Sequence, residues 1–271
     1  MLSHSVNRSL CSAVLTALTV VVTGCQSTTV SEAGPATALS SQPVTAVQAS
    51  AAPVPPVISD WQVIGTSVQG RPIRARTVGN GPRSVLFIGG VHGDEAEGAY
   101  TADKLPQAVL DAGLAGAVTL TIVEDANPDG RAAGSRENAN GVDINRNFPS
   151  TNFSHGTAAY GTTPLSQPES RAIYDSIEKT TPTLIIAMHA WAGKRFVNYD
   201  GPAKEIAQRF SATTGLPVEA STEFAATPGS LGSYAGRDRG IPILTVEVLK
   251  GTDPHEVWDN LHTALIGAIA G

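Results

Sequence analysis

The sequence predicts an α/β sandwich that is built on a largely parallel or mixed β-sheet. Short apolar runs bounded by glycine or polar residues, which are typical of buried strands, recur along the chain. Segments with helical spacing of apolar residues alternate with these runs, and this alternation favours an α/β architecture. The composition is compatible with a packed core, because 41% of the 271 residues are hydrophobic and 15% are charged.

The first half of the predicted domain contains four strands and one helix. Residues 61–65 and 71–78 predict two strands joined by a glycine-containing turn. Residues 84–90 (SVLFIGG) are an apolar run bounded by glycine, which indicates a buried strand. Residues 96–112 place apolar side chains at helical spacing and predict a helix, and residues 117–124 (AVTLTIVE) predict the next strand.

The second half begins with a long polar segment. Residues 125–165 are rich in Asn, Gly, Arg and Pro, and we expect them to form a loop. Loops longer than ~15 residues are uncommon in compact domains and often carry function. Strands are expected at 183–188 (TLIIAM) and 241–249, which are both apolar runs. The remaining predicted helices are 168–179, 203–214 and 254–270.

The first 25 residues resemble the signal peptide of a bacterial lipoprotein. The apolar stretch 10–22 is shorter than the ~20 apolar residues of a membrane-spanning helix, but it suits the apolar region of an export signal. It ends in Val-Thr-Gly-Cys, which resembles a lipobox and predicts a lipid on Cys25. An ordinary cleaved signal with an incidental cysteine is the alternative. We therefore expect an exported protein that is lipid-anchored to the membrane through Cys25, at the periplasmic or outer-membrane face of the cell envelope.

Residues 26–57 are expected to form a disordered tether, since they are rich in Ser, Thr, Ala and Pro and contain one charged residue, Glu32. A globular domain is predicted at 58–271. Both cysteines, Cys11 and Cys25, precede this domain, so it contains no disulfide and no cysteine-based metal site. The net charge is -6 and no run of Lys or Arg offers a footprint for nucleic acid, which is therefore not an expected partner.

Two histidines and one acid are candidate metal ligands. His92 and Glu95 are three positions apart, and Gly93 between them allows a turn that brings both side chains to one ion. His189 directly follows the apolar run 183–188. Two histidines and one glutamate are an established ligand set for catalytic zinc. The alternatives are a surface histidine beside a helix-start carboxylate for the first pair, and a core histidine with a backbone partner for the last.

Other polar residues suit substrate binding or proton transfer. Arg136 and Arg146 carry planar guanidinium groups that suit a carboxylate or a developing oxyanion, although solvated arginines are the usual alternative. Glu247 lies inside the apolar run IPILTVEV, where an acid is costly to bury without a partner or a role. A strand acid at a sheet edge is the alternative. His92, His189 and Glu247 all lie near predicted strand ends, where ligands gather in open α/β sheets.

Together these motifs resemble those of the zinc carboxypeptidase family. They follow the family's order over nearly all of residues 60–250: His-Gly-Asp-Glu at 92–95, Asn-Pro-Asp-Gly at 127–130, Arg-x-Asn-x-x-Gly-Val-Asp-x-Asn-Arg-Asn-Phe-Pro at 136–149, His189, and Thr-x-Glu at 245–247. The resemblance implies a peptide or amide hydrolase that uses one zinc ion. It also implies a single domain whose mixed, mostly parallel sheet is flanked by helices on both faces.

The resemblance assigns the metal centre to four residues. His92, Glu95 and His189 correspond to the family's zinc ligands. Asp143 corresponds to an acid that orients the first histidine, a support that zinc-binding imidazoles usually have. These roles are therefore what membership of the family implies for this chain.

Four further residues correspond to those that bind and cleave the substrate. Arg136 corresponds to the arginine that polarises the scissile carbonyl and stabilises its oxyanion. Asn145 and Arg146 correspond to the pair that binds the terminal carboxylate of the substrate. Glu247 corresponds to the general base that activates water and passes its proton to the leaving amine.

Two features of the family have no clean counterpart. In the family, a mobile tyrosine precedes the catalytic glutamate. Alignment through the following Gly-Ser places Phe224 at that position, and Tyr234 lies nearby but shifted. Leu231 falls near the position that sets side-chain preference, and its apolar side chain gives no simple support for basic residues.

The short domain and the sequence TPGSLGSY at 227–234 resemble the compact murein tripeptide amidase branch of this family. The expected substrate is therefore a murein peptide, cut between γ-D-glutamate and diaminopimelate. A general C-terminal carboxypeptidase is one alternative. A deacylase of the succinylglutamate desuccinylase or aspartoacylase group is another, and a non-catalytic binding lipoprotein is a third.

Overall fold

The computed structural model describes residues 58–221 and 227–271. The expected signal peptide with Cys25 and the expected tether at 26–57 lie outside the described residues, and so does Phe224. Within the described ranges, no helix has the length and apolar character needed to cross a membrane.

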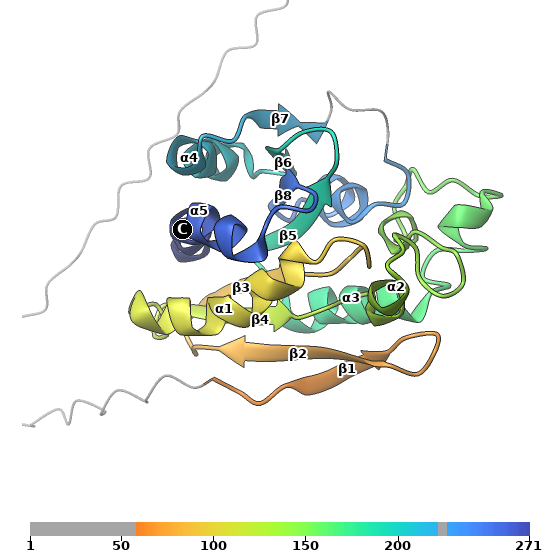
Figure 1. Cartoon of the computed structure of the whole chain (residues 1–271), viewed down its shortest axis with the longest axis horizontal. Helices are drawn as coiled ribbons and strands as arrows, with labels where there is room; N and C mark the ends of the chain where they lie inside the picture. Colours follow the sequence, from red (N-terminus) through yellow and green to blue (C-terminus); the bar gives the residue numbers. More distant parts are fainter. Residues whose placement is uncertain (1–57, 222–226) are drawn as a thin grey trace, which may run out of the picture. The chain divides into compact units, whose positions relative to one another are not determined.

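A mixed sheet of eight strands organises the described domain (Figure 1). The strand order across the sheet is β1-β2-β4-β3-β5-β8-β6-β7. The strands are β1 (Gln62–Thr66), β2 (Pro72–Val78), β3 (Arg83–Ile88), β4 (Val118–Val123), β5 (Leu184–Trp191), β6 (Phe196–Asp200), β7 (Val218–Ala220) and β8 (Ile243–Leu249).

Parallel pairing dominates the centre of the sheet. Strands β4, β3, β5 and β8 are parallel neighbours, while β2 and β6 join this group on either side in antiparallel orientation. Parallel strands are covered on both faces and therefore need nearly continuous apolar runs. Strand β5 (LIIAMHAW) meets this need, because it is buried from Leu184 to Ala190. The predicted mixed, mostly parallel sheet is confirmed.

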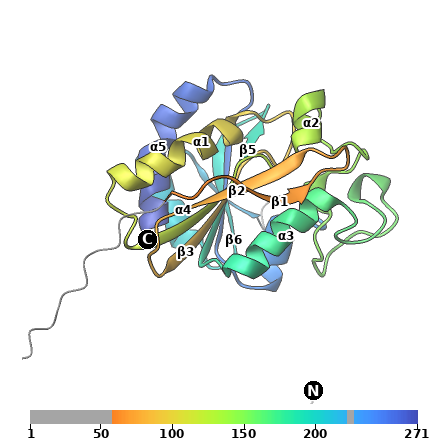
Figure 2. The same cartoon turned by 90° about the horizontal axis from the view of Figure 1, so that it is seen from below.

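Helices cover both faces of this sheet (Figure 2). Along β3, Val85 and Phe87 pack with α1, α4 and α5, while Leu86 and Ile88 pack with α3 and η4. The predicted two-sided helical layer is therefore confirmed. The helices are α1 (Glu97–Asp111), α2 (Pro128–Ala133), α3 (Pro168–Thr180), α4 (Lys204–Thr214) and α5 (Pro254–Ala270), with the short η1 (Ile144–Arg146), η2 (Ala158–Tyr160) and the π-helical η4 (Gly232–Asp238).

The structure corrects the prediction in the polar segment and beside it. Residues 125–165 contain α2, η1 and η2 rather than one continuous loop. The Asn-Pro-Asp-Gly motif begins α2, because the Asn127 side chain accepts a hydrogen bond from the Gly130 N–H at 3.0 Å and caps the helix. Strands β6 and β7 were not predicted. They have five and three residues, too few to show a clear apolar period.

Candidate active site

The sheet brings the predicted functional residues to one edge. His92 and Glu95 lie between β3 and α1, His189 lies on β5, and Glu247 lies on β8. These three strands are parallel neighbours, so their carboxyl ends lie at the same edge of the sheet. His189 and Glu247 are paired in register on adjacent strands. Residues that are far apart in the sequence therefore meet around one point.

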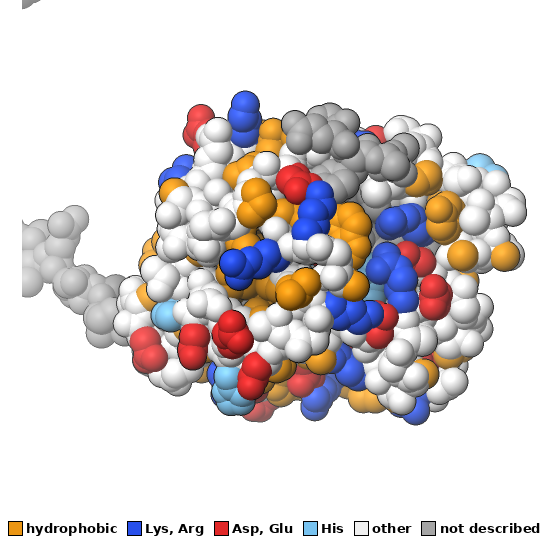
Figure 3. Space-filling view, turned by 45° about the horizontal axis from the view of Figure 1, so that its top comes forward, with side chains coloured by type: hydrophobic (Ala, Val, Ile, Leu, Met, Phe, Trp, Pro, Cys, Tyr) orange, Lys and Arg blue, Asp and Glu red, His pale blue; other side chains and the backbone are white. Residues whose placement is uncertain are grey.

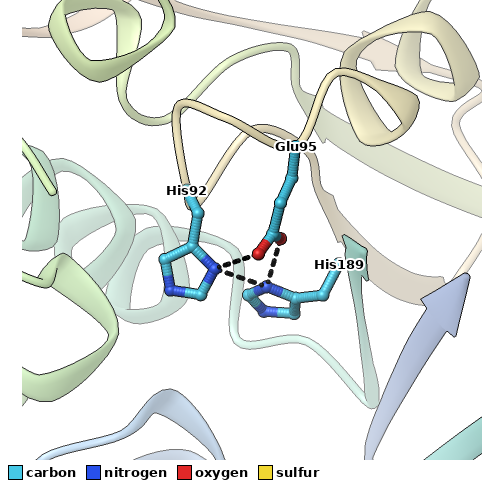
Figure 4. A group of neighbouring side chains, drawn as sticks. All are labelled: His92, Glu95 and His189. Carbon is cyan, nitrogen blue, oxygen red and sulfur yellow. Dashed lines mark hydrogen bonds and ion pairs between the residues drawn. The ribbon is translucent and has the colours of Figure 1, made fainter. Parts of the chain in front are cut away.

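His92, Glu95 and His189 converge in a buried cluster (Figure 4). Nδ1 of His92 lies 2.8 Å from Oε1 of Glu95, and Nδ1 of His189 lies 3.0 Å from Oε2. The two Nδ1 atoms are 3.1 Å apart. The Ala190 N–H donates to Oε2 at 3.1 Å and helps to fix the carboxylate. Among residues 58–221 and 227–271, this is the one group of three or more His, Cys, Asp or Glu that meets the geometry of a metal site.

The tautomer of His92 suits a metal at this cluster. Its Nε2 lies 3.2 Å from Oδ1 of Asp143, so a neutral ring places its proton there and leaves the Nδ1 lone pair facing Glu95 and His189. Burial raises the pKa of Glu95, but the hydrogen bonds and charges of His189 and His92 outweigh it and hold that pKa well below its usual range. Two imidazoles and one ionised carboxylate thus converge, and this donor set fits one zinc ion.

Asp143 also holds Arg136 against the cluster. Nη2 and Nε of Arg136 donate to Oδ2 of Asp143 at 2.9 and 3.1 Å. Nη1 of the same guanidinium lies 3.5 Å from Oε1 of Glu95. Burial raises the pKa of Asp143, but the hydrogen bond to His92 and the neighbouring charges lower it far below its usual range. Asp143 is therefore an ionised anchor that orients both the imidazole and the guanidinium.

Asn145 and Arg146 lie beside this centre at η1. The Asp143 carboxylate accepts the Asn145 N–H at 2.9 Å and caps the short helix. The Asn145 side-chain oxygen accepts the Leu231 N–H at 2.9 Å, which joins this segment to the start of η4. Nη1 of Arg146 donates to the Asn145 carbonyl at 2.8 Å, and the remaining guanidinium donors suit a carboxylate.

Glu247 is half-buried on β8 and lines the same cavity as the metal cluster. Burial raises the pKa of its carboxyl, and the nearby Glu95 carboxylate raises it further, while His189 opposes this effect. The net shift is upward. A carboxyl whose pKa moves toward neutrality can both accept and return a proton, which is the property that a general base of a hydrolase needs.

A cavity of about 450 Å³ joins all these groups. Lys and Arg side chains gather beside hydrophobic ones on one face of the domain (Figure 3). The wall includes seven of the eight predicted site residues, and Asp143 supports it from behind. The lining residues that carry a charge or an imidazole are His92, Glu95, Arg136, Arg146, His189, Asp200 and Glu247.

Residues 48–228 match the zinc carboxypeptidase family. This chain belongs to that family. The matched range contains His92, Glu95 and His189 and ends before Glu247. The protein is therefore a zinc-dependent hydrolase of peptide or amide bonds, and the predictions of an enzyme and of a zinc cofactor are confirmed.

Curated relatives indicate which branch of the zinc carboxypeptidases this chain resembles. The chain is 30% identical over 179 residues to murein peptide amidase A of Escherichia coli strain K12, covering 60% of this chain and 70% of that protein. It is 29% identical over 179 residues to murein peptide amidase A of Vibrio campbellii, covering 60% of this chain and 68% of the relative. The predicted resemblance to this branch is confirmed.

Solved structures share the fold of this zinc carboxypeptidase. The murein-tripeptide amidase of Escherichia coli O157 superimposes with a TM-score of 0.61 at 24% identity, over 79% of this chain and 92% of that chain. Carboxypeptidase A of Helicoverpa armigera superimposes with a TM-score of 0.64 at 19% identity, over 80% of this chain and 69% of that chain. The carboxypeptidase-like fold thus extends over most of this chain.

Asp200 is a functional candidate that the sequence analysis missed. It ends β6, is 7% exposed, and lines the cavity. Its Oδ1 accepts hydrogen bonds from the Ser221 hydroxyl and from Nε of Arg237, the latter at 2.9 Å. A Cβ at Gly232 would overlap Oδ2, so glycine leaves this oxygen room. Asp200 did not stand out as a candidate, because the short sequence FVNYD mixes apolar and polar residues and was not predicted to be a strand.

The structure shows where Leu231 and Tyr234 lie, the two residues near family positions that had no clean counterpart. Leu231 is 3% exposed and packs in the core with α3, so it does not line the cavity, where Asp200 supplies an acid instead. Tyr234 is also buried, stacks with Phe148, and donates its hydroxyl to Glu178 at 3.0 Å. Tyr234 therefore lies away from the cavity and is not the counterpart of the mobile tyrosine.

Proposed function

We propose that this enzyme hydrolyses the γ-D-glutamyl–diaminopimelate bond of murein peptides. The observation that carries this proposal is that one cavity is lined by both Arg146 and Asp200. A C-terminal diaminopimelate has one carboxylate beside the scissile bond, and the far end of its side chain carries an ammonium group and a second carboxylate. The cavity offers Arg146 for the first carboxylate and Asp200 for the ammonium group. The names of the murein peptide amidases that resemble this chain support the same substrate.

His92, Glu95 and His189 hold the zinc ion in this proposal. The bound ion supplies Lewis-acid activation of water and of the scissile carbonyl. Asp143 keeps the His92 proton on Nε2, which leaves Nδ1 as the ligand atom. The Ala190 N–H holds Oε2 of Glu95 in place.

Glu247 moves the proton. Its carboxylate takes a proton from the attacking water and then delivers it to the nitrogen of the leaving diaminopimelate. The raised pKa of Glu247 makes its carboxylate a stronger base toward that water. Its register with His189 places Glu247 on the strand next to a metal ligand, where its carboxylate can take the proton of the water that attacks the scissile carbonyl.

Arg136, Asn145 and Arg146 bind the substrate on the other wall. The Arg136 guanidinium faces the metal cluster and donates to the carbonyl oxygen as negative charge develops on it. Arg146 with the Asn145 amide binds the terminal carboxylate. Asp143 already accepts two donors of Arg136, so the guanidinium is held in place before substrate arrives.

We also propose that the enzyme is exported and lipid-anchored through Cys25. The apolar stretch at 10–22 and the following Val-Thr-Gly-Cys support this location. Murein peptides occur in the cell envelope, which would bring enzyme and substrate together. Metabolic labelling with a fatty acid tests the proposal: Cys25→Ser should abolish the label, and a label that persists in this variant would refute the anchor.

A comparison of three tripeptides tests the proposed substrate. The zinc-loaded protein is incubated with L-Ala-γ-D-Glu capped by diaminopimelate, by lysine or by leucine, with and without a chelator, and products are identified by mass spectrometry. Fastest release of diaminopimelate, abolished by the chelator, is the expected result. Equal cleavage of ordinary α-linked peptides would indicate a general carboxypeptidase, and cleavage of N-acyl amino acids alone would indicate a deacylase.

A further inference from the structure

Two acids that flank Glu95 reach away from the cavity toward the chain that follows β8. Asp94 precedes Glu95, and Glu97 is the first residue of α1. Glu97 is only 3% exposed. Neither acid lines the cavity, so neither contacts the substrate there.

Each acid binds one of two neighbouring residues. Oδ2 of Asp94 forms an ion pair with Nζ of Lys250, and Oε1 of Glu97 accepts the Gly251 N–H at 2.8 Å. The other oxygens, Oδ1 of Asp94 and Oε2 of Glu97, are buried without a hydrogen-bond partner in the described part of the chain. Burial of such atoms costs free energy that these atoms do not recover. The contacts that do form hold the two carboxylates against Lys250 and Gly251.

Lys250 and Gly251 lie three and four residues after Glu247. The Lys250 N–H also donates to the Trp191 carbonyl at 3.1 Å, two residues after His189. The segment after β8 is thus bound to β5 on one side and to the loop of His92 and Glu95 on the other. These bonds join the strand of the proton-transferring carboxyl to the loop that carries two metal ligands.

We propose that Asp94 and Glu97 are positioning residues that set the placement of Glu247 relative to the metal ligands. The inference rests on the role of Glu247 given above. An error of about 1 Å between reacting groups costs roughly 100-fold in rate. Loss of the two bonds would release the segment after β8 while the metal ligands keep their own contacts with Asp143 and Ala190.

Variants at position 97 test the proposal in the full chain. For Glu97→Ala we expect kcat to fall about 10- to 100-fold, with KM within about twofold of the native value and one zinc per chain retained. Amide hydrogen exchange of residues 249–252 should accelerate, because the Gly251 N–H loses its acceptor. Glu97→Gln keeps a side-chain oxygen for that N–H and should recover most of kcat. Asp103→Ala on the same helix removes an exposed acid and is the matched control.

Lys250→Met provides a second, independent test, because it removes the ion pair from its more exposed side. We expect a several-fold lower kcat at unchanged KM and zinc content. Native kcat in both Glu97→Ala and Lys250→Met would overturn the proposal, as would a loss of kcat that matches a loss of zinc. Glu247→Gln is measured in parallel. Full turnover in that variant would refute the role of Glu247 as the base. If Glu247→Gln is inactive but Glu97→Ala and Lys250→Met keep the native kcat, only the positioning role is refuted.

Discussion

The two walls of the cavity are built in different ways. The loop wall consists of Arg136, Asn145 and Arg146, which come from the polar segment 125–165. The strand wall consists of Asp200 on β6 and Glu247 on β8. The loop wall presents cationic and amide donors, and the strand wall presents carboxylates. A substrate in this cavity therefore meets groups of both charges, which favours one orientation over others.

Different bonds hold the two walls. The strand wall is fixed by backbone pairing, since Glu247 lies opposite both His189 and Phe196 in the sheet. The loop wall has no such ladder and depends on buried amides instead. The Asn147 side chain, for example, donates to the Tyr160 and Thr163 carbonyls at 2.7 and 2.9 Å. Loss of one of these buried amides would therefore remove bonds that no strand pairing replaces.

Removal of the proton-transferring group on the strand wall should have the largest effect. Glu247→Gln keeps the volume of the side chain but cannot accept a proton from water, so we expect kcat to fall by about 1,000-fold or more. Zinc content should remain at one ion per chain, because Glu247 is not among the three clustered ligands. Steady-state kinetics with metal analysis by mass spectrometry checks this. Turnover near the native value would remove Glu247 from the base role.

Arg146→Met on the loop wall should have the next largest effect, and it should be confined to substrates with a free carboxylate. Loss of a charged hydrogen-bonding partner for that carboxylate costs about 1.5–3 kcal/mol, or roughly 10- to 150-fold in kcat/KM. The same peptide with a C-terminal amide is the control substrate. A similar fractional loss on both peptides would show that Arg146 does not bind the terminal carboxylate.

The loop wall could be predicted from the sequence, and the strand wall only in part. Arg136, Asn145 and Arg146 stand in one continuous motif whose residue types and spacing carry the resemblance. Glu247 stood out because an acid interrupts an apolar run. Asp200 gave no such signal, since its strand is short and its position in the cavity depends on pairing between β6 and β8.

The same distinction applies to the fold. The central strands β3 and β5 were predicted because parallel strands buried on both faces need apolar runs. The outer strands β6 and β7 are short, and tertiary pairing rather than local sequence makes them strands. The sequence shows that Asn147 is polar, but it does not predict which groups its amide binds, because these partners are set by the folded path of the segment.

Asp200→Asn on the strand wall should change selectivity more than rate. The substitution removes the carboxylate and leaves the Arg237 guanidinium without its ion-pair partner, so the side-chain pocket becomes more positive. We expect about tenfold lower kcat/KM for the diaminopimelate and lysine tripeptides, and an unchanged or higher value for the leucine tripeptide. Similar losses of kcat/KM on all three peptides would mean that Asp200 supports the fold and does not select the side chain of the substrate.

The smallest expected effect is on stability, and it lies behind the loop wall. Asp129 on α2 accepts hydrogen bonds from Ser67 Oγ at 2.8 Å, the Gln69 N–H at 2.8 Å and Nη1 of Arg71 at 2.6 Å. The next residue, Gly130, packs so closely against Gly93 in the metal loop that a Cβ at Gly93 would overlap its backbone. Asp129 therefore connects the β1–β2 turn to the support of His92 and Glu95.

Burial raises the pKa of Asp129, but the hydrogen bonds and the Arg71 charge outweigh it and lower the pKa in the folded state. A lowered folded pKa stabilises the protein above the unfolded value of about 4, and this contribution is lost as pH falls toward the folded pKa. Asp129→Asn should lower the free energy of unfolding by about 2 kcal/mol at pH 7, and the difference from the native protein should shrink below about pH 4. Urea unfolding from pH 7 to pH 3, with Asp103→Asn as the exposed control, measures both effects. A difference that stays constant across this range would show that the lost stability does not come from the carboxylate charge of Asp129.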